Sequence, residues 1–115
     1  MATLHSTLRA SAAGTTGTIT GSTFSYGRFR DGIVHCIASA KDAGATTLDV
    51  DIQTSHDGTN FVACVSFVQF TAVGNKYVQL PNSAGPYIRY VATLGGGPAD
   101  TWTFAITLAA NPVPQ

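Results

Sequence analysis

The residues that most suggest catalytic chemistry are Ser55-His56-Asp57, which contain the three residue types of a hydrolytic triad. In a triad, the nucleophile, the base and the residue that orients the base face one another from separate points of the chain. Three consecutive residues cannot do this, because their side chains point in different directions. Asp57-Gly58 is also a common pair in tight turns, which explains the same residues. We therefore predict a hairpin turn here.

The other two histidines give no better candidate for catalysis. His5 lies in an N-terminal segment of small polar residues, and His35 lies within the apolar stretch Ile33–Ala40. In such a strand we expect a hydrogen-bonded structural histidine rather than a general base. A catalytic site needs several convergent titratable groups, and the sequence has few. We predict no catalytic, cofactor-binding or metal-binding residues, and therefore no enzyme and no cofactor.

Three aspartates are candidate ligands for Ca²⁺, which prefers several oxygen atoms. Asp49 and Asp51 share one face of a predicted strand, roughly 7 Å apart by strand geometry, and Asp57 follows nearby. No Asp-rich calcium loop is present. The alternative is a solvated polar face whose charges discourage unwanted pairing of strand edges. The sequence favours this polar face.

Cys36 and Cys64 both lie inside apolar strand patterns, and they lack the Cys-x-x-Cys spacing of many metal sites. Buried free thiols are the rule in a protein that is made in a reducing cytosol. A disulfide between neighbouring strands remains the alternative, because the sequence does not say whether the two cysteines are close enough to pair.

Two further patterns suggest ligand binding. Gly95-Gly96-Gly97-Pro98 is rich in glycine, but a strand follows it, so it lacks the helix N-terminus of a phosphate loop. Arg28 and Arg30 flank Phe29 close to Tyr26, which forms a small basic and aromatic patch. Such a patch can stack on a nucleic-acid base. With so few other cations, we instead expect contact with carboxylates of a partner protein, or simple packing.

Aromatic residues are the remaining candidates, because exposed rings stack on sugars. Tyr77 and Tyr87 are predicted to be exposed, whereas Trp102 fits the inward face of its strand. A carbohydrate-binding module therefore stays open as an alternative function.

Strands with alternating apolar and polar residues must position all of these side chains. Such alternation is typical of antiparallel sheets. The predicted strands are Ile33–Ala40, Thr46–Thr54, Phe61–Phe70, Lys76–Leu80, Tyr87–Leu94 and Trp102–Leu108, with shorter ones near residues 18–20 and 24–26. The first and third are apolar on both faces, which predicts central positions in a sheet. We predict an all-β fold without helices: an antiparallel β-sandwich of jelly-roll or Greek-key type with seven to eight strands.

The predicted domain organisation has three parts. Residues 1–23 are small, polar and poor in core-forming groups, which predicts a flexible or extended N-terminal arm. Residues 24–110 form the β-sandwich domain. Residues 111–115 form a C-terminal tail, since prolines there remove ladder donors.

The composition excludes several classes of function. The 115 residues suit one domain, and charged residues make up 10%, against roughly 25% in typical soluble domains. Six Lys and Arg balance six acidic residues, so the net charge of zero gives no steering towards nucleic acid or an anionic membrane.

No apolar run approaches the roughly 18 residues that span a bilayer, and no secretory signal is recognisable at the N-terminus. An uncharged surface rich in Thr and Ala suits either a protein packed against others or a small domain kept soluble by its hydroxyls.

The central block resembles a recurrent type of small β-sandwich encoded among the structural genes of tailed bacteriophages. The resemblance covers about residues 31–110. It rests on Leu48–Gln53, on the hairpin Ser55–Phe61, on Tyr87–Val91 and on the glycine-rich loop with its following strand. These motifs are structural, and the resemblance carries over no catalytic residues. It implies a virion component: a capsid decoration (cement) protein, a head or tail fibre domain, or an accessory tail module.

From this resemblance and the low charge, we expect a capsid decoration protein at the capsid surface of a virion, assembled in the host cytoplasm. It would be a homotrimer at local symmetry axes of the head, and it would bind across subunits of the major capsid protein. Residues 1–23 would extend over a neighbour by strand addition. The alternatives are a carbohydrate-binding or host-recognition module of a head or tail fibre, and a tail or neck component.

Overall fold

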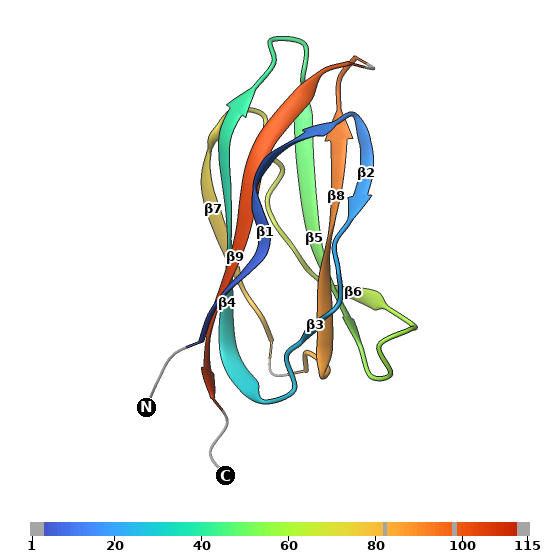
Figure 1. Ribbon diagram of the computed structural model, residues 1–115, viewed down its shortest axis with the longest axis vertical. Coiled ribbons are helices and arrows are strands. Elements are labelled where there is room, and N and C mark those ends of the chain that lie inside the picture. The colour runs from blue at the N-terminus through green and yellow to red at the C-terminus, as the bar shows by residue number, and fades with distance from the viewer. Residues whose placement is uncertain (1–3, 82, 98, 113–115) are drawn as a thin grey trace.

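The computed structural model describes residues 4–81, 83–97 and 99–112, which form two antiparallel β-sheets packed face to face (Figure 1). Sheet A contains, in spatial order, β1 (Leu4–Thr15), β9 (Thr101–Pro112), β4 (Phe29–Lys41) and β7 (Gly74–Gln79). Sheet B contains β2 (Gly17–Thr20), β8 (Tyr87–Gly95), β5 (Thr47–Ser55) and β6 (Val62–Ser66), and β3 (Phe24–Ser25) also pairs with β8. The described residues include no helix that could cross a membrane. The predicted all-β sandwich is confirmed.

The chain crosses repeatedly between the two sheets, so strands distant in sequence become neighbours. The first strand, β1, pairs with the last, β9, and β9 also pairs with β4. This order agrees with the predicted jelly-roll or Greek-key type. The described residues form nine strands rather than seven or eight, because β2 and β3 are separate short segments on the same neighbour.

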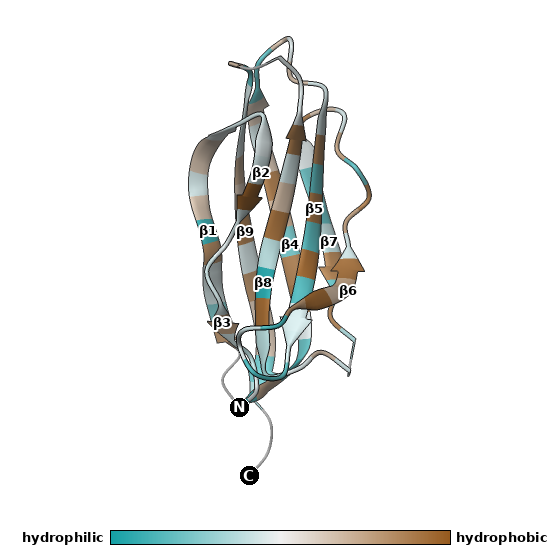
Figure 2. Cartoon of the chain, turned by 90° about the vertical axis from the view of Figure 1, so that its right-hand side faces the viewer, coloured by the Kyte–Doolittle hydropathy of each residue, from teal (hydrophilic) through white to brown (hydrophobic). Residues whose placement is uncertain are grey.

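The core lies between the sheets and follows the alternation in the sequence. On β9, the inward side chains of Trp102, Phe104 and Ile106 are fully buried, as predicted. The inward side chains of β5, including Val50 and Ile52, face them from sheet B and are equally buried. Figure 2 shows the resulting alternation of hydrophobic and hydrophilic residues along β5 and β8. Each such side chain contributes about 1.5–3 kcal/mol by leaving water.

Residues 4–20 are part of the sandwich rather than a separate arm. β1 forms the edge of sheet A beside β9, and β2 continues into sheet B beside β8. Leu4, Leu8 and Ile19 pack against the core, although small residues surround them. Pairing by main-chain groups does not need large side chains, which explains why the composition suggested an arm. At the other end, β9 includes residues 111 and 112, while residues 1–3 and 113–115 lie outside the described residues.

The strand predicted over Phe61–Phe70 is shorter and lies in a different position. β6 ends at Ser66 and forms the edge of sheet B, so it is not central. Phe67 and Phe70 are buried beyond its end, and Phe70 forms an isolated bridge with Leu48. Val62 is 64% exposed and Val68 is 75% exposed. Apolar residues on both faces therefore do not signal a central strand here.

Candidate functional site

The most distinctive surface of the protein is the outer face of sheet A, which we call face A. Its outward side chains are His5 and Thr7 on β1, Thr103, Ala105, Thr107 and Ala109 on β9, Ile33, His35 and Ile37 on β4, and Asn75, Tyr77 and Gln79 on β7. None of these residues is Asp, Lys or Arg, and the charged outward residue Arg30 of β4 lies opposite Asn111 at the end of the face. Small Thr and Ala side chains run along its middle, and Tyr77 lies at its β7 edge with 68% of its surface exposed.

Removing water from face A costs little free energy. Charged groups carry the largest desolvation penalty on burial, and hydroxyl groups carry a smaller one that a single hydrogen bond offsets. Cores of protein interfaces are depleted of charged residues for this reason. Face A therefore has the composition of a surface that another protein covers.

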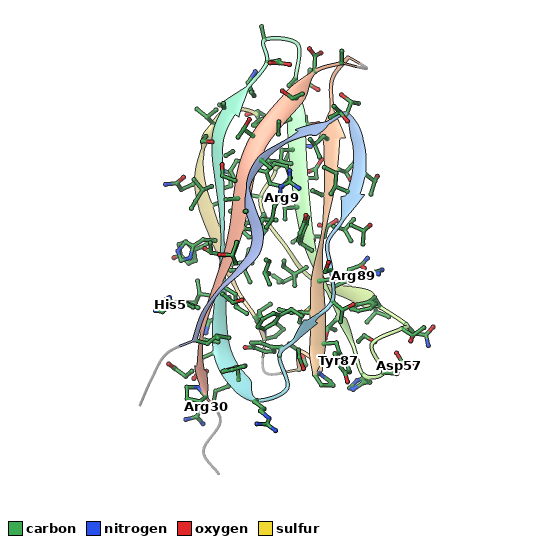
Figure 3. All side chains as sticks on the ribbon, viewed as in Figure 1. His5, Arg9, Arg30, Asp57, Tyr87 and Arg89 are labelled. Carbon is green, nitrogen blue, oxygen red and sulfur yellow. The ribbon has the colours of Figure 1, made fainter. Side chains whose placement is uncertain are left out.

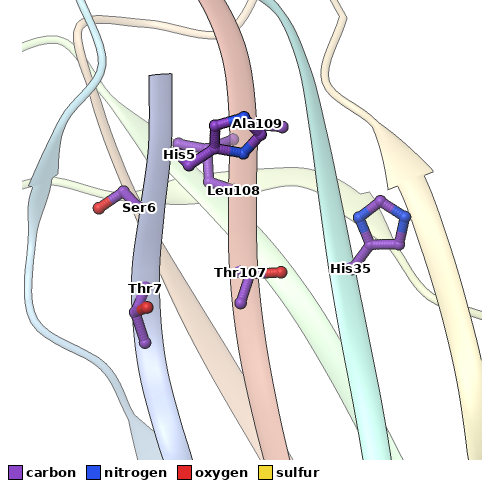
Figure 4. Close-up of a pocket in the computed structure, with 7 residues that line it drawn as sticks. All are labelled: His5, Ser6, Thr7, His35, Thr107, Leu108 and Ala109. Carbon is purple, nitrogen blue, oxygen red and sulfur yellow. The ribbon is translucent and has the colours of Figure 1, made fainter. Parts of the chain in front are cut away.

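A shallow hollow of about 360 Å³ lies on face A (Figure 4). His5 and His35 line it from strands on either side of β9, with Thr107 between them. The sequence predicts a hydrogen-bonded structural histidine at residue 35, and the structure places His35 at an outward, exposed position of β4. Its ring lies 5.8 Å from that of Tyr77, centroid to centroid.

The hollow offers hydrogen bonds but no arrangement for catalysis. Its lining contains two imidazoles and the hydroxyls of Ser6, Thr7 and Thr107, without a carboxylate to orient either imidazole. Within residues 4–81, 83–97 and 99–112, no group of three or more His, Cys, Asp or Glu side chains is placed to hold a metal ion.

The Ser55-His56-Asp57 run forms a turn, as predicted. One carboxylate oxygen of Asp57 accepts hydrogen bonds from the backbone amides of Thr59 and Asn60, both at 2.8 Å, and from the Ser55 hydroxyl at 2.9 Å. These hydrogen bonds, led by that from Asn60, hold the pKa of Asp57 well below its usual range. The Asp57 carboxylate therefore stabilises the turn at the end of the hairpin (Figure 3).

The outer face of sheet B, which we call face B, carries charge. Its outward side chains include Asp49, Asp51 and Gln53 on β5 and Arg89, Val91 and Thr93 on β8. Asp49 accepts hydrogen bonds from the amide of Gln69 at 3.0 and 3.1 Å, and Arg89 donates one to Gln53 at 2.8 Å. Asp49 and Asp51 therefore lie on a polar surface, as the sequence favoured.

Most cationic side chains lie over aromatic rings rather than forming a basic surface. Cation–ring contacts join Arg9 to Phe104, Lys41 to Trp102, Lys76 to Phe70 and Arg89 to Phe61, at 4.0–5.9 Å from the ring centroids. The predicted patch around Arg28 and Arg30 lacks its second ring, because Tyr26 is buried and accepts a hydrogen bond from the Gly32 amide. Burial raises the pKa of Tyr26 despite this bond.

The two cysteines are free thiols on different sheets. Cys36 is buried in sheet A, and burial raises its pKa to about 12. Cys64 is half-buried in β6 of sheet B, and burial also raises its pKa. Since the thiolate is the reactive form, neither environment activates the sulfur.

The three aromatic residues considered for sugar binding have different environments. Trp102 is fully buried, as predicted, and its indole Nε1 has no hydrogen-bond partner among the described residues. Tyr87 is half-buried beside the hairpin loop. Only Tyr77 of these three presents a largely exposed ring.

Several members of face A can be recognised in the sequence, but the face as a whole cannot. Thr103, Ala105 and Thr107 alternate visibly along one strand. His5 and His35 join them only because β1 and β4 both pair with β9, across long stretches of sequence. The available signal is the scarcity of charge at the outward positions of these strands, where Arg30 at one end is charged.

Comparisons with known proteins establish the fold and no more. No known protein family matches the chain, and no curated protein is significantly similar to it in sequence. Among solved structures, it is similar to the SPBc2 prophage-derived protein YomS, with a TM-score of 0.54, 15% identity and coverage of 93% of both chains. It is also similar to PirA, with a TM-score of 0.52, 13% identity and coverage of 95% of this chain and 93% of that one. At such identities the likeness shows a shared fold alone.

Proposed function

We propose that the protein is a non-enzymatic structural component of a bacteriophage virion, which decorates the capsid by placing face A across neighbouring subunits of the major capsid protein. The observation that carries the proposal is the lack of charged residues in the central part of face A, on β1, β9, β4 and β7, with Arg30 lying only at its end opposite Asn111. A β-sheet face of this composition is suited to protein–protein contact.

The proposed action is mechanical. Thr and Ala side chains on β9 are short, so a partner surface can approach the backbone of sheet A closely. The central part of face A lacks the charge needed for electrostatic steering, so its association with a partner is not accelerated by long-range attraction. Many copies on one shell multiply these contacts into a stable coat.

The similarity to YomS supports the phage context of the proposal. That protein is described as prophage-derived, and it shares the fold of this chain over nearly its whole length. The motifs around Leu48–Gln53 and Ser55–Phe61, which resemble phage structural proteins, lie on β5 and its hairpin in this fold.

The experiment that tests the proposal is co-sedimentation with expanded, undecorated phage capsids. Thr107→Lys places a charge at the centre of face A, whereas Thr93→Lys places the same charge on face B beside Asp49. We expect wild type and Thr93→Lys to bind and Thr107→Lys to lose at least tenfold in affinity. Because the central part of face A has no charged residue, we also expect binding that changes little between low and high salt.

Two results would contradict this proposal. Absence of binding by the wild-type protein would overturn the decoration function. Equal loss of binding in both lysine variants would show that face A is not the surface involved. Thermal unfolding of both variants checks that the substitutions leave the sandwich folded.

Carbohydrate binding is a second candidate, favoured by the exposed ring of Tyr77. A hollow of about 330 Å³ adjoins this ring, between β7 and the chain after β6. A sugar stacked on Tyr77 would fit the predicted host-recognition module. Binding of the isolated protein to a glycan array, lost in Tyr77→Ala, would favour this function over decoration.

A further inference from the structure

The edge strands of the sandwich differ in how they are protected against pairing with other strands. β1 shifts register twice against β9, and β6 shifts once against β5. β2 and β3 have only four and two residues. Bulges and short strands are the means by which proteins block unwanted edge pairing. These edges of the described sheets are therefore blocked.

β7 is the exception. Its residues pair one by one with β4 from Gly74 to Gln79 without a register shift. The strand contains no proline, and its one charged residue, Lys76, turns inward, with Nζ 5.2 Å from the centroid of the Phe70 ring. Figure 1 shows β7 at the outer edge of sheet A. A regular and uncharged edge is a template for another strand.

The free main-chain groups of this edge can be assigned to particular residues. The amide of Leu80 donates a 2.7 Å hydrogen bond to the carbonyl of Gly32, the residue opposite it in the β4–β7 register. Hydrogen-bonded and non-bonded pairs alternate along antiparallel strands. Lys76 and Val78 therefore also bond to β4. The N–H and C=O groups of Asn75, Tyr77 and Gln79 point away from β4, into the open edge.

We infer that the β7 edge binds the β7 edge of a second copy of this chain, antiparallel and about a two-fold axis at Tyr77. In this register Tyr77 lies opposite its own counterpart, and Asn75 lies opposite Gln79. All the outward N–H and C=O groups of these three residues then find partners. The side chains supply an aromatic pair and two amide pairs, which are favourable across strands.

Charge and chain chemistry select this register. Lys76 lies opposite Val78 of the second copy, so no like charges meet. Moving the axis to Lys76 would place two lysines opposite each other, which is unfavourable. Moving it to Val78 would place Asn75 opposite Pro81, which has no N–H to donate.

Side chains beside the edge extend the contact beyond the main chain. Val68, Tyr77 and Val78 help to line the hollow that runs along β7. Val68 is 75% exposed and Tyr77 is 68% exposed, and a second copy would cover both. The symmetric pairing needs no unidentified partner, because the edge complements itself.

The pairing joins two copies of sheet A into one continuous sheet. A two-fold axis perpendicular to the sheet places both copies of face A on the same side, so the proposed docking surface doubles in area. The homotrimer expected from the sequence stays a prediction, and the mass of the protein in solution distinguishes it from this dimer. The inference itself does not depend on the proposed function.

The experiment measures the mass of the purified protein by sedimentation over a concentration series, together with amide hydrogen exchange. We expect a dimer, twice 11.9 kDa, that dissociates on dilution. The amides of Asn75, Tyr77 and Gln79 should exchange at least tenfold more slowly in the dimer than in the monomer. The amides of Lys76 and Val78 should be protected at both concentrations, because they bond to β4.

Two variants test the edge directly. Tyr77→Pro removes an N–H that does not bond to β4, so it should abolish the dimer while the edge strand remains in place. Tyr77→Lys places two lysines opposite each other at the axis, and we expect at least a tenfold weaker dimer. Thr93→Lys is the matched control on face B and should leave the dimer unchanged. If Tyr77→Pro fails to fold, Tyr77→Lys still decides the question.

Several outcomes would overturn the inference. These are a monomer at every concentration, a trimer or hexamer, a dimer unaffected by Tyr77→Lys, and equal protection of the Asn75, Tyr77 and Gln79 amides at high and low concentration. A monomer that still binds capsids would overturn the dimer and leave the proposed function standing. A dimer that binds no capsid would support the inferred pairing and overturn the proposed decoration function.

Discussion

Face A and face B belong to sheets of the same kind, yet they carry different chemistry. Both sheets pack large apolar side chains inward with the same alternation. On the outside, β9 presents Thr107 and Ala109, whereas β5 presents Asp49 and Asp51. Face B pairs several of its polar groups with one another, Gln69 with Asp49 and Arg89 with Gln53. Face A has few such internal partners.

The difference shows which part of the sequence is free to serve function. Inward positions are fixed by the need to fill the core, so they are alike in both sheets. Outward positions contribute little to folding, and their composition is therefore open to selection by a partner. A face that stays in water retains charge, and a face that is covered loses it.

The largest expected effect concerns the hydrophobic core, which both sheets share. Phe104→Ala beneath face A should lower the free energy of unfolding by about 3–5 kcal/mol, and Ile52→Ala beneath face B by about 2–5 kcal/mol, because both side chains are fully buried. The outward Ala105→Ser on β9 should stay within about 0.5 kcal/mol of wild type. Urea unfolding measures all three. A costly Ala105→Ser would contradict the view that outward positions are free.

A smaller effect is expected on face B itself. Arg89→Ala removes the hydrogen bond to Gln53 and the guanidinium that lies 4.0 Å from the Phe61 ring centroid. We expect a loss of about 1 kcal/mol in the free energy of unfolding. Thr93→Ser on the same strand serves as the control. If the two variants have the same free energy of unfolding, the polar contacts on face B do not stabilise the fold.

The smallest effect concerns the hairpin that ends sheet B. The folded-state pKa of Asp57 is depressed, so its charge stabilises the hairpin above the ordinary pKa of aspartate. This contribution is lost as the pH falls through that range towards the folded-state pKa. Asp57→Asn should therefore be less stable than wild type at pH 7, and the difference should shrink on acidification. Unfolding at several pH values measures it, and a difference that grows at low pH would exclude this role.

Local patterns predicted some elements well. The Trp102–Leu108 alternation defined both faces of β9, and Asp57-Gly58 defined a turn, because each depends on neighbouring residues alone. Local patterns do not predict that residues 4–20 pair within both sheets, or that β6 is a short edge strand. Leu4, Leu8 and Ile19 gain their core contacts from β9 and β8. The edge position of β6 depends on which strands lie beside it, and composition does not contain that information.

The amino-acid sequence alone determined the all-β class, the inward side chains of most strands and the turn at Asp57, since these follow from alternation and turn chemistry. Only the tertiary structure decided that His5 and His35 share one uncharged face and that β7 has an open and regular edge. Both features arise from strand pairing between distant segments. Pairing is set by how the whole chain fills one core, so no local stretch of sequence specifies it.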